Sequence, residues 1–256
     1  MGKYILREIR TALRKKMTIV IAVVIVAACI LSNLAVMAFT LIYGSNIDGV
    51  RAYNVLEFGT WVFWIPYLVT IFMAHSVFGS ECPDPHIKDN ITKNLSRTGI
   101  YIGKLLAAMV EAVFYMIIAV VAFLGATRMF HSDMKLRNVK DFLQKTLLAV
   151  PLWVAGVSIG MMFLFIFKEK LKAYIGFYIL TFVIPMIVTW LSEDKLSLPF
   201  ARTVRTLLVK QSFSHIPSTA DPARNVTFIV CQGLLYAVIA AVIGIIAYRK
   251  RDFKKD

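Results

Sequence analysis

The segment 17–43 is 27 residues long and contains no charged side chain. About 20 apolar residues are enough for a helix to cross the hydrocarbon core of a bilayer. A helix also satisfies its backbone N–H and C=O groups internally, as a segment surrounded by lipid must. This segment therefore favours a membrane protein and argues against an ordinary soluble enzyme.

Five further segments have the length and apolar character to cross a membrane. Charged residues make up only 17% of the chain and lie mainly between these segments. The sequence predicts an all-α membrane protein with six transmembrane helices in a single transmembrane domain over 1–256. The expected spans are 17–43, 58–80, 105–127, 146–167, 173–191 and 226–248.

The distribution of lysine and arginine predicts the orientation. With the N-terminus inside, the inner segments hold 18 of these residues in 53 positions, and the outer segments hold 11 in 66. Cytoplasmic loops carry the excess of positive charge, so we expect both termini to be cytoplasmic and the chain to lie in the cell membrane. The net charge of +14 suits contact with membrane lipid, and a nucleic-acid partner is not expected.

The N-terminal segment 1–16 has the pattern of an amphipathic interfacial helix. One face of this helix carries the apolar side chains Ile5, Ile9, Ala12 and Leu13. Arginines at 7, 10 and 14 lie on the opposite face. Such a helix rests in the headgroup layer with its cations toward phosphates. The alternative is a basic tail that only obeys the positive-inside rule.

The segment 81–104 is the longest expected cytoplasmic connection. Pro83 and Pro85 end the preceding helix, and Ile87, Ile91 and Leu95 then recur at helical spacing. A short helix with one apolar stripe has to bury that stripe. It can do so against lipid, in a groove of a soluble partner, or on its own bundle.

Two motifs and the layout carry a resemblance to a known family. The run ITKNLSRTGIYIGKL at 91–105 resembles the intracellular loop of bacterial ABC-2 type transporter permeases, and YRKRDF at 248–253 resembles that family's C-terminal ending. The six spans and the basic N-terminal helix are also similar. The sequence ECPDP at 81–85 departs from the family's Glu-x-x-x-Gly-Thr form, which leaves the start of the loop helix open. The loop is most similar to those of lantibiotic-immunity and amphipathic-toxin exporters.

The resemblance implies an ABC-2 (type V exporter-like) bundle and a function. The chain would be the permease subunit of an ATP-driven exporter and would form a path for a peptide, lipid or drug that is amphipathic or hydrophobic. A homodimer or heterodimer of permeases would bind a separate ABC ATP-binding subunit, which holds ATP and Mg. The coupling residues carried over from the family loop are His86, Ile87, Asn90, Ile91, Lys93, Asn94, Leu95 and Ser96.

The sequence has no nucleotide-binding or catalytic motif of its own. The pattern G-x-x-x-x-G-K-[ST] is absent, and so are H-E-x-x-H and G-x-S-x-G. Cys29, Cys82 and Cys231 form no ligand-like cluster, so we expect free thiols, no metal and no cofactor in this chain. We therefore expect a transporter subunit that is not an enzyme. The alternatives are a non-transporting anchor or sensor subunit that recruits a cytoplasmic partner, and a secondary carrier.

Three features in or beside the spans are candidates for a role in gating or helix packing: the polar residues His75 and Glu111, the lysine at 104, and a pair of glycines in the fourth span. Glu111 is the only acidic residue well inside a span, and a charge at that depth should face protein or water. His75 lies at a similar depth, so the two form a candidate gate pair; the alternative is a buried polar pair or a protonated Glu111. Lys104 is expected to snorkel to the interface, and Gly156 and Gly160 to allow close helix contact.

The outer loop 192–225 is the longest connection between spans. After Pro199, apolar residues at 200, 204, 207 and 208 alternate with basic ones at helical spacing, which predicts a short amphipathic helix. The family resemblance implies an extracellular lid here. The alternative is a loop that rests on lipid and takes no part in gating.

Overall fold

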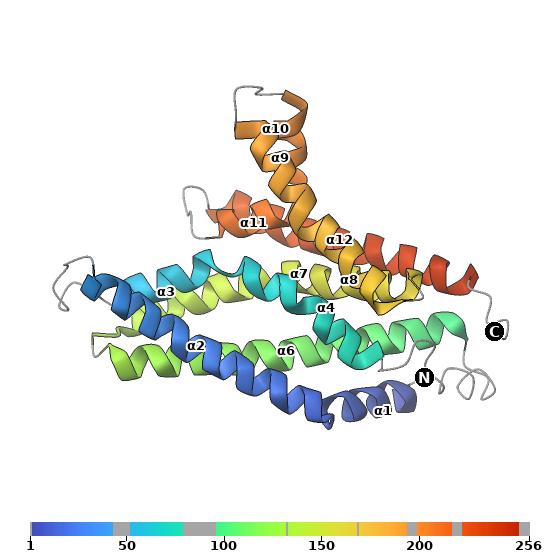
Figure 1. Cartoon of the computed structure of the whole chain (residues 1–256), viewed down its shortest axis with the longest axis horizontal. Coiled ribbons are helices and arrows are strands. Elements are labelled where there is room, and N and C mark those ends of the chain that lie inside the picture. Colours follow the sequence, from blue (N-terminus) through green and yellow to red (C-terminus); the bar gives the residue numbers. More distant parts are fainter. Residues whose placement is uncertain are drawn as a thin grey trace.

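The structure, a computed structural model, describes residues 2–42, 52–78, 96–131, 133–167, 169–193, 199–216 and 222–250. These residues are helical almost throughout and contain no strand (Figure 1). Five helices are long and apolar enough to cross a membrane, or six if the bent pair α3 (Ala52–Trp61) and α4 (Trp64–Phe78) forms one span. The prediction of an all-α protein is confirmed for the described residues, and several of their helices are long and apolar enough to cross a membrane.

Helix α7 (Leu136–Ile166) is the central helix of the bundle. It packs against α4, α6 (Arg97–Phe130), α8 (Lys170–Tyr178) and α12 (Pro222–Lys250). A Cβ added to Gly156 would lie 2.6 Å from Thr70 Oγ1, and one added to Gly160 would lie 3.1 Å from the Ile71 backbone. The two glycines therefore let α7 approach α4 closely, as the sequence predicts.

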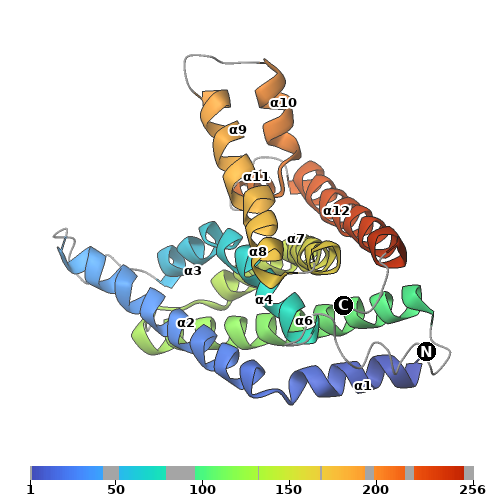
Figure 2. The same cartoon turned by 45° about the vertical axis from the view of Figure 1, so that its right-hand side comes forward.

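Helices α1 (Gly2–Leu13) and α2 (Lys16–Ile42) lie along α6 (Figures 1 and 2). Helix α1 is amphipathic: Tyr4 and Ala12 are buried, and Arg7 and Arg10 are exposed. The other residues of the predicted apolar face, Ile5, Ile9 and Leu13, are half-buried. Its buried face rests on the start of α6, so protein packing as well as lipid can hold it. Apart from its contact with α6, α2 is largely exposed.

The second span is bent where the sequence predicts one continuous helix over 58–80. Helices α3 and α4 meet at 54°. Pro66 cannot donate to the carbonyl of Val62, and its ring would clash with that carbonyl in a continuous helix. The indole Nε1 of Trp153 in α7 donates to the oxygen of Phe63 at 3.0 Å, which satisfies a carbonyl that the break leaves open.

The fifth span contains a π-helix at its middle. Helix α8 continues into η2 (Ile179–Val183) and then α9 (Ile184–Glu193). Pro185 has no N–H for the carbonyl of Thr181, so a regular register cannot continue through this point. The Thr181 hydroxyl donates back to the oxygen of Phe177 at 2.7 Å.

The outer loop 192–225 is largely helical in its described part. Helix α10 (Pro199–Leu207) is the helix expected after Pro199, and it lies beside α9, where the two rise away from the bundle (Figure 2). Helix α11 (Val209–His215) turns back toward η2 and α7.

Several helices extend beyond the spans expected from hydropathy. Helix α7 begins at Leu136 rather than at 146, and α6 begins at Arg97 rather than at 105. The apolar stretch reflects the thickness of the hydrocarbon core, whereas polar turns can continue a helix past it. Residues 97–104 of the expected cytoplasmic segment are therefore the first two turns of α6.

Candidate functional site

The expected coupling residues lie mostly in a segment outside the described residues. His86, Ile87, Asn90, Ile91, Lys93, Asn94 and Leu95 all fall there. Ser96 is described, and its Oγ accepts a hydrogen bond from the Gly99 N–H at 3.1 Å, so it is the N-cap of α6. The structure describes the two helix ends on either side of that segment, residues 76–78 of α4 and 97–104 of α6, which we call the loop base.

The residues Tyr101 and Gly103 in the loop base each fit against a different helix. The Tyr101 hydroxyl lies only 2.1 Å from where a Cβ of Gly244 in α12 would be, and a Cβ on Gly103 would lie 2.5 Å from the ring of Tyr4 in α1. Neither close approach would be possible with a larger residue at these glycines. The aromatic-x-Gly part of the predicted motif thus docks α6 on α12 and α1.

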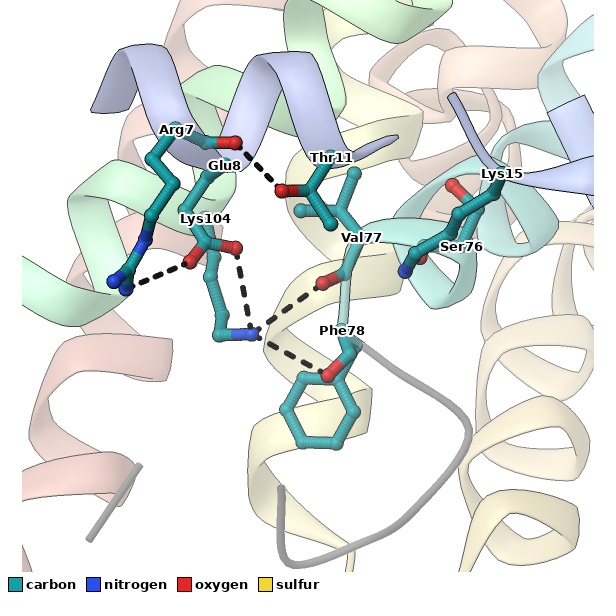
Figure 3. Close-up of polar contacts among 8 residues, drawn as sticks. All are labelled: Arg7, Glu8, Thr11, Lys15, Ser76, Val77, Phe78 and Lys104. Carbon is teal, nitrogen blue, oxygen red and sulfur yellow. Dashed lines mark hydrogen bonds and ion pairs between the residues drawn. The ribbon is translucent and has the colours of Figure 1, made fainter. Parts of the chain in front are cut away.

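Lys104, the last residue of that motif, is buried, and the prediction that it snorkels is wrong (Figure 3). Only 2% of its surface is exposed. Its ammonium donates to the carbonyl oxygens of Val77 and Phe78 at 3.4 Å each, and its Nζ lies 3.9 Å from Oε2 of Glu8 in α1. The carbonyls at a helix C-terminus have no partner within the helix and carry partial negative charge. Lys104 therefore caps α4 and links it to α1.

An aromatic cluster on the other side of the loop base joins four helices. The ring centroid of Phe165 in α7 lies 4.8 Å from that of Phe78, 4.8 Å from that of Tyr101 and 4.7 Å from that of Tyr248. All four side chains are buried. The Arg97 guanidinium also donates to the Arg249 carbonyl at 2.9 Å, so the start of α6 is attached to the end of α12.

Glu111 lies two turns further along α6 and is fully buried. Its carboxyl group accepts a hydrogen bond from Tyr115 Oη at 2.8 Å, and the hydroxyls of Thr18 (Oγ1 at 3.3 Å) and Ser76 also lie within hydrogen-bond distance of it. Each of these two hydroxyls has one proton and a second acceptor nearby, the carbonyl oxygen of Ala12 or of Met73. The three hydroxyls come from α6, α2 and α4. Lys15, in the turn between α1 and α2, donates to the carbonyl oxygen of Ser76. A continuous set of polar contacts therefore runs from the α1–α2 turn through Ser76 to Glu111.

In the structure, His75 and Glu111 form hydrogen bonds with different neighbours. The Nδ1 of His75 is hydrogen-bonded to the hydroxyl of Tyr174 in α8, whereas Glu111 lies within hydrogen-bond distance of Ser76, the next residue of α4. Adjacent residues of a helix do not face the same side. The hydroxyls of Ser76, Tyr115 and Thr18 were missed at the sequence level, although Tyr115 follows Glu111 at the i+4 spacing.

Within the described part of the chain, no three His, Cys, Asp or Glu side chains come together as a metal site. The family model that matches this chain covers residues 19–254 and is described as a protein of unknown function, DUF2705. The chain belongs to the DUF2705 family. The curated proteins contain no match to it. The matched range includes the loop base, Glu111 and every candidate span of this DUF2705 chain except the first residues of α2, and helix α1 precedes it.

Removal of the Glu111 carboxylate from this DUF2705 protein should destabilise the bundle. We expect Glu111→Ala to lower the free energy of unfolding by about 2 kcal/mol, because the buried Tyr115 hydroxyl loses the carboxyl oxygen that accepts from it. Glu111→Gln keeps a carbonyl oxygen as acceptor and should cost less than half of that. Thermal unfolding in detergent, followed by circular dichroism, measures both. Equal melting temperatures for the two variants would contradict a structural role of the acceptor.

Proposed function

We propose that this chain is the membrane-spanning permease subunit of an ATP-driven exporter, and that a separate ABC ATP-binding subunit engages the segment that holds the expected coupling residues, 86–96. The observation that carries the proposal is the attachment of the loop base. The helices that precede and follow the segment, α4 and α6, are tied to α1, α7 and α12 through Lys104, Tyr101 and Phe165. A displacement of the segment would therefore reach most of the bundle.

The length of α6 gives such a displacement a route across the membrane. This helix has 34 residues, and at 1.5 Å per residue it is about 51 Å long, longer than a bilayer is thick. Its start lies in the loop base and its other end reaches the opposite side of the bundle (Figure 1). Shifts of whole helices are a recognised form of conformational change. A shift of α6 would also move α1 and α2, which pack against it.

The path itself would form between two permease chains. Most of α2 and much of α12 expose apolar side chains, which suits contact with lipid, a second permease and an amphipathic or hydrophobic cargo. In this arrangement the chain lies in the cell membrane with both termini cytoplasmic. ATP and Mg bind the partner subunit, and this chain contributes no catalytic residue.

Attachment of the ATP-binding subunit can be tested with charged substitutions in the expected coupling helix. We expect the variant Ile91→Asp with Leu95→Asp to lose the ATP-binding subunit on affinity purification from its native membrane, because two carboxylates would have to enter an apolar groove. The unchanged chain should retain an ATPase that is encoded beside it. Leu136→Asp is the control, since Leu136 is 84% exposed and begins α7 at the opposite end of the bundle.

Three outcomes of this experiment separate the candidate functions. Loss of the ATPase from the double variant alone, with normal membrane insertion, supports the permease assignment. Retention of the ATPase by the double variant would refute the coupling role of Ile91 and Leu95. Capture of a cytoplasmic protein without ATP-binding motifs by the unchanged chain would favour an anchor or sensor subunit.

A further inference from the structure

Lys210 of α11 places its ammonium over two aromatic rings. The Nζ lies 5.3 Å from the ring centroid of Trp64 in α4 and 5.3 Å from that of Phe182 in η2. The two rings are stacked on each other with a centroid distance of 6.5 Å and an interplanar angle of 20°. All three side chains are half-buried, so the group is held by protein and is still open on one side.

The position of this ammonium along the spans is unusual. Trp64 lies near the middle of the bent pair α3–α4, and Phe182 near the middle of the Lys170–Ser192 span. Each ring also marks a break, the 54° bend in one span and the π-helix in the other. Ionisable residues held among membrane-crossing helices are costly and mark substrate or ion pathways, and π-helical segments are frequent at functional sites.

Helix α11, which carries Lys210, and the end of α10 just before it are held in place by polar contacts with α12. Gln232 donates through Nε2 to the Leu207 carbonyl at 2.7 Å, and the Tyr236 hydroxyl donates to the same carbonyl at 2.8 Å. Ser212, which is fully buried, is hydrogen-bonded to Gln232 Oε1. The position of Lys210 is therefore fixed by the fold of the α10–α11 region.

The charge around Lys210 favours an anion. Among the carboxylates whose side chains the structure describes, a set that leaves out residues 193 and 194, none forms an ion pair with Lys210. A ring face attracts an ammonium but leaves its N–H donors available, and a phosphate or carboxylate oxygen would accept from them.

We propose that Lys210, Trp64 and Phe182 form a binding site for the acidic headgroup of an amphipathic lipid. Met186, one turn beyond Phe182, and Val183 are exposed on the same span, so an acyl chain can lie against them while the headgroup meets Lys210. Binding of this lipid does not rest on the proposed permease function.

Quenching of Trp64 fluorescence by brominated lipids tests the site. The full-length protein is reconstituted in phosphatidylcholine vesicles that contain phosphatidylglycerol brominated on its acyl chains, and in matched vesicles in which phosphatidylcholine carries the bromine. The part of the quenching that disappears in Trp64→Phe reports on lipid at Trp64. We expect this part to show a preference of about fivefold for the acidic lipid, as one partly buried ion pair would give.

The variants distinguish this site from a general attraction to a basic protein. Lys210→Met should remove the preference, and Lys210→Arg should retain it. Lys140→Met, which removes a charge from an exposed lysine of α7, should leave it unchanged. Inorganic phosphate should not displace the lipid; displacement would overturn the assignment to an amphipath.

Two results would overturn the proposal directly. One is equal quenching of Trp64 by both lipids in the unchanged protein, and the other is a preference that persists in Lys210→Met. Neither result depends on the ATP-binding subunit. If the lipid preference is found and no ATPase copurifies, the permease function fails while the lipid site stands; the reverse result removes only the lipid site.

Discussion

Gly233→Ala is expected to lower the free energy of unfolding by about 3 kcal/mol, the upper part of the range for overpacking a tight interface. A Cβ on Gly233 would lie 2.6 Å from the carbonyl carbon of Pro151 and 2.7 Å from its oxygen. These are backbone atoms of α7, so no side chain can rotate to make room. Helix α12 would have to move away from the central helix along an extensive contact.

A second glycine in a helix provides the matched control for this prediction. Nothing lies within 4 Å of a Cβ added to Gly125 in α6, so Gly125→Ala should raise stability by about 0.5–1 kcal/mol through the gain in helix propensity. Thermal unfolding of both variants in the same detergent gives the comparison, with about 2–4 °C expected per kcal/mol. Similar melting temperatures for the two alanine variants would contradict the close contact of α12 with α7.

Lys104→Met is expected to destabilise the loop base by about 3 kcal/mol, as when one partner of a buried ion pair is removed. The Glu8 carboxylate is only 15% exposed and would lose the buried ammonium, although Arg7 remains 3.7 Å away. The carbonyls of Val77 and Phe78 would lose the same donor. The effect is measured by thermal unfolding and by the rate at which a protease releases α1.

Two further variants separate charge from packing at Lys104. Glu8→Gln combined with Lys104→Met should recover more than half of the lost stability, because it removes the carboxylate left without its partner. Lys172→Met breaks an exposed pair with Glu169 at 2.9 Å and should cost less than about 0.5 kcal/mol. A double variant no more stable than Lys104→Met alone would show that Glu8 is not the reason for the loss.

The features that could be predicted from the sequence are those with a local signal. The charge-free segment 17–43 became α2, the apolar face of 1–16 became the buried face of α1, and the residues after Pro199 became α10. The spacing of Gly156 and Gly160 also indicated close packing correctly. In each case the pattern lies within one element, so no knowledge of distant neighbours is needed.

The features that were missed depend on residues far apart in the sequence. Lys104 resembles a snorkelling lysine at a span boundary until Glu8 and the end of α4 are placed beside it. Pro66 signals a disturbed helix, but the bend is stabilised by Trp153 from another helix. The hydroxyl partners of Glu111 come partly from α2 and α4, and hydropathy alone does not indicate which helices face each other.

The packing of α1 against α6 has a consequence for the order in which the protein assembles during synthesis. Helix α1 leaves the ribosome before the residues that receive it, Gly103 and Lys104, which are synthesised only after two apolar segments have followed α1. Domains assemble as the growing chain supplies their parts. During that interval the apolar face of α1 has no α6 to pack against and is buried among lipid headgroups at the membrane surface. Surface binding of α1 would then be a stage of biogenesis that ends when α6 is synthesised.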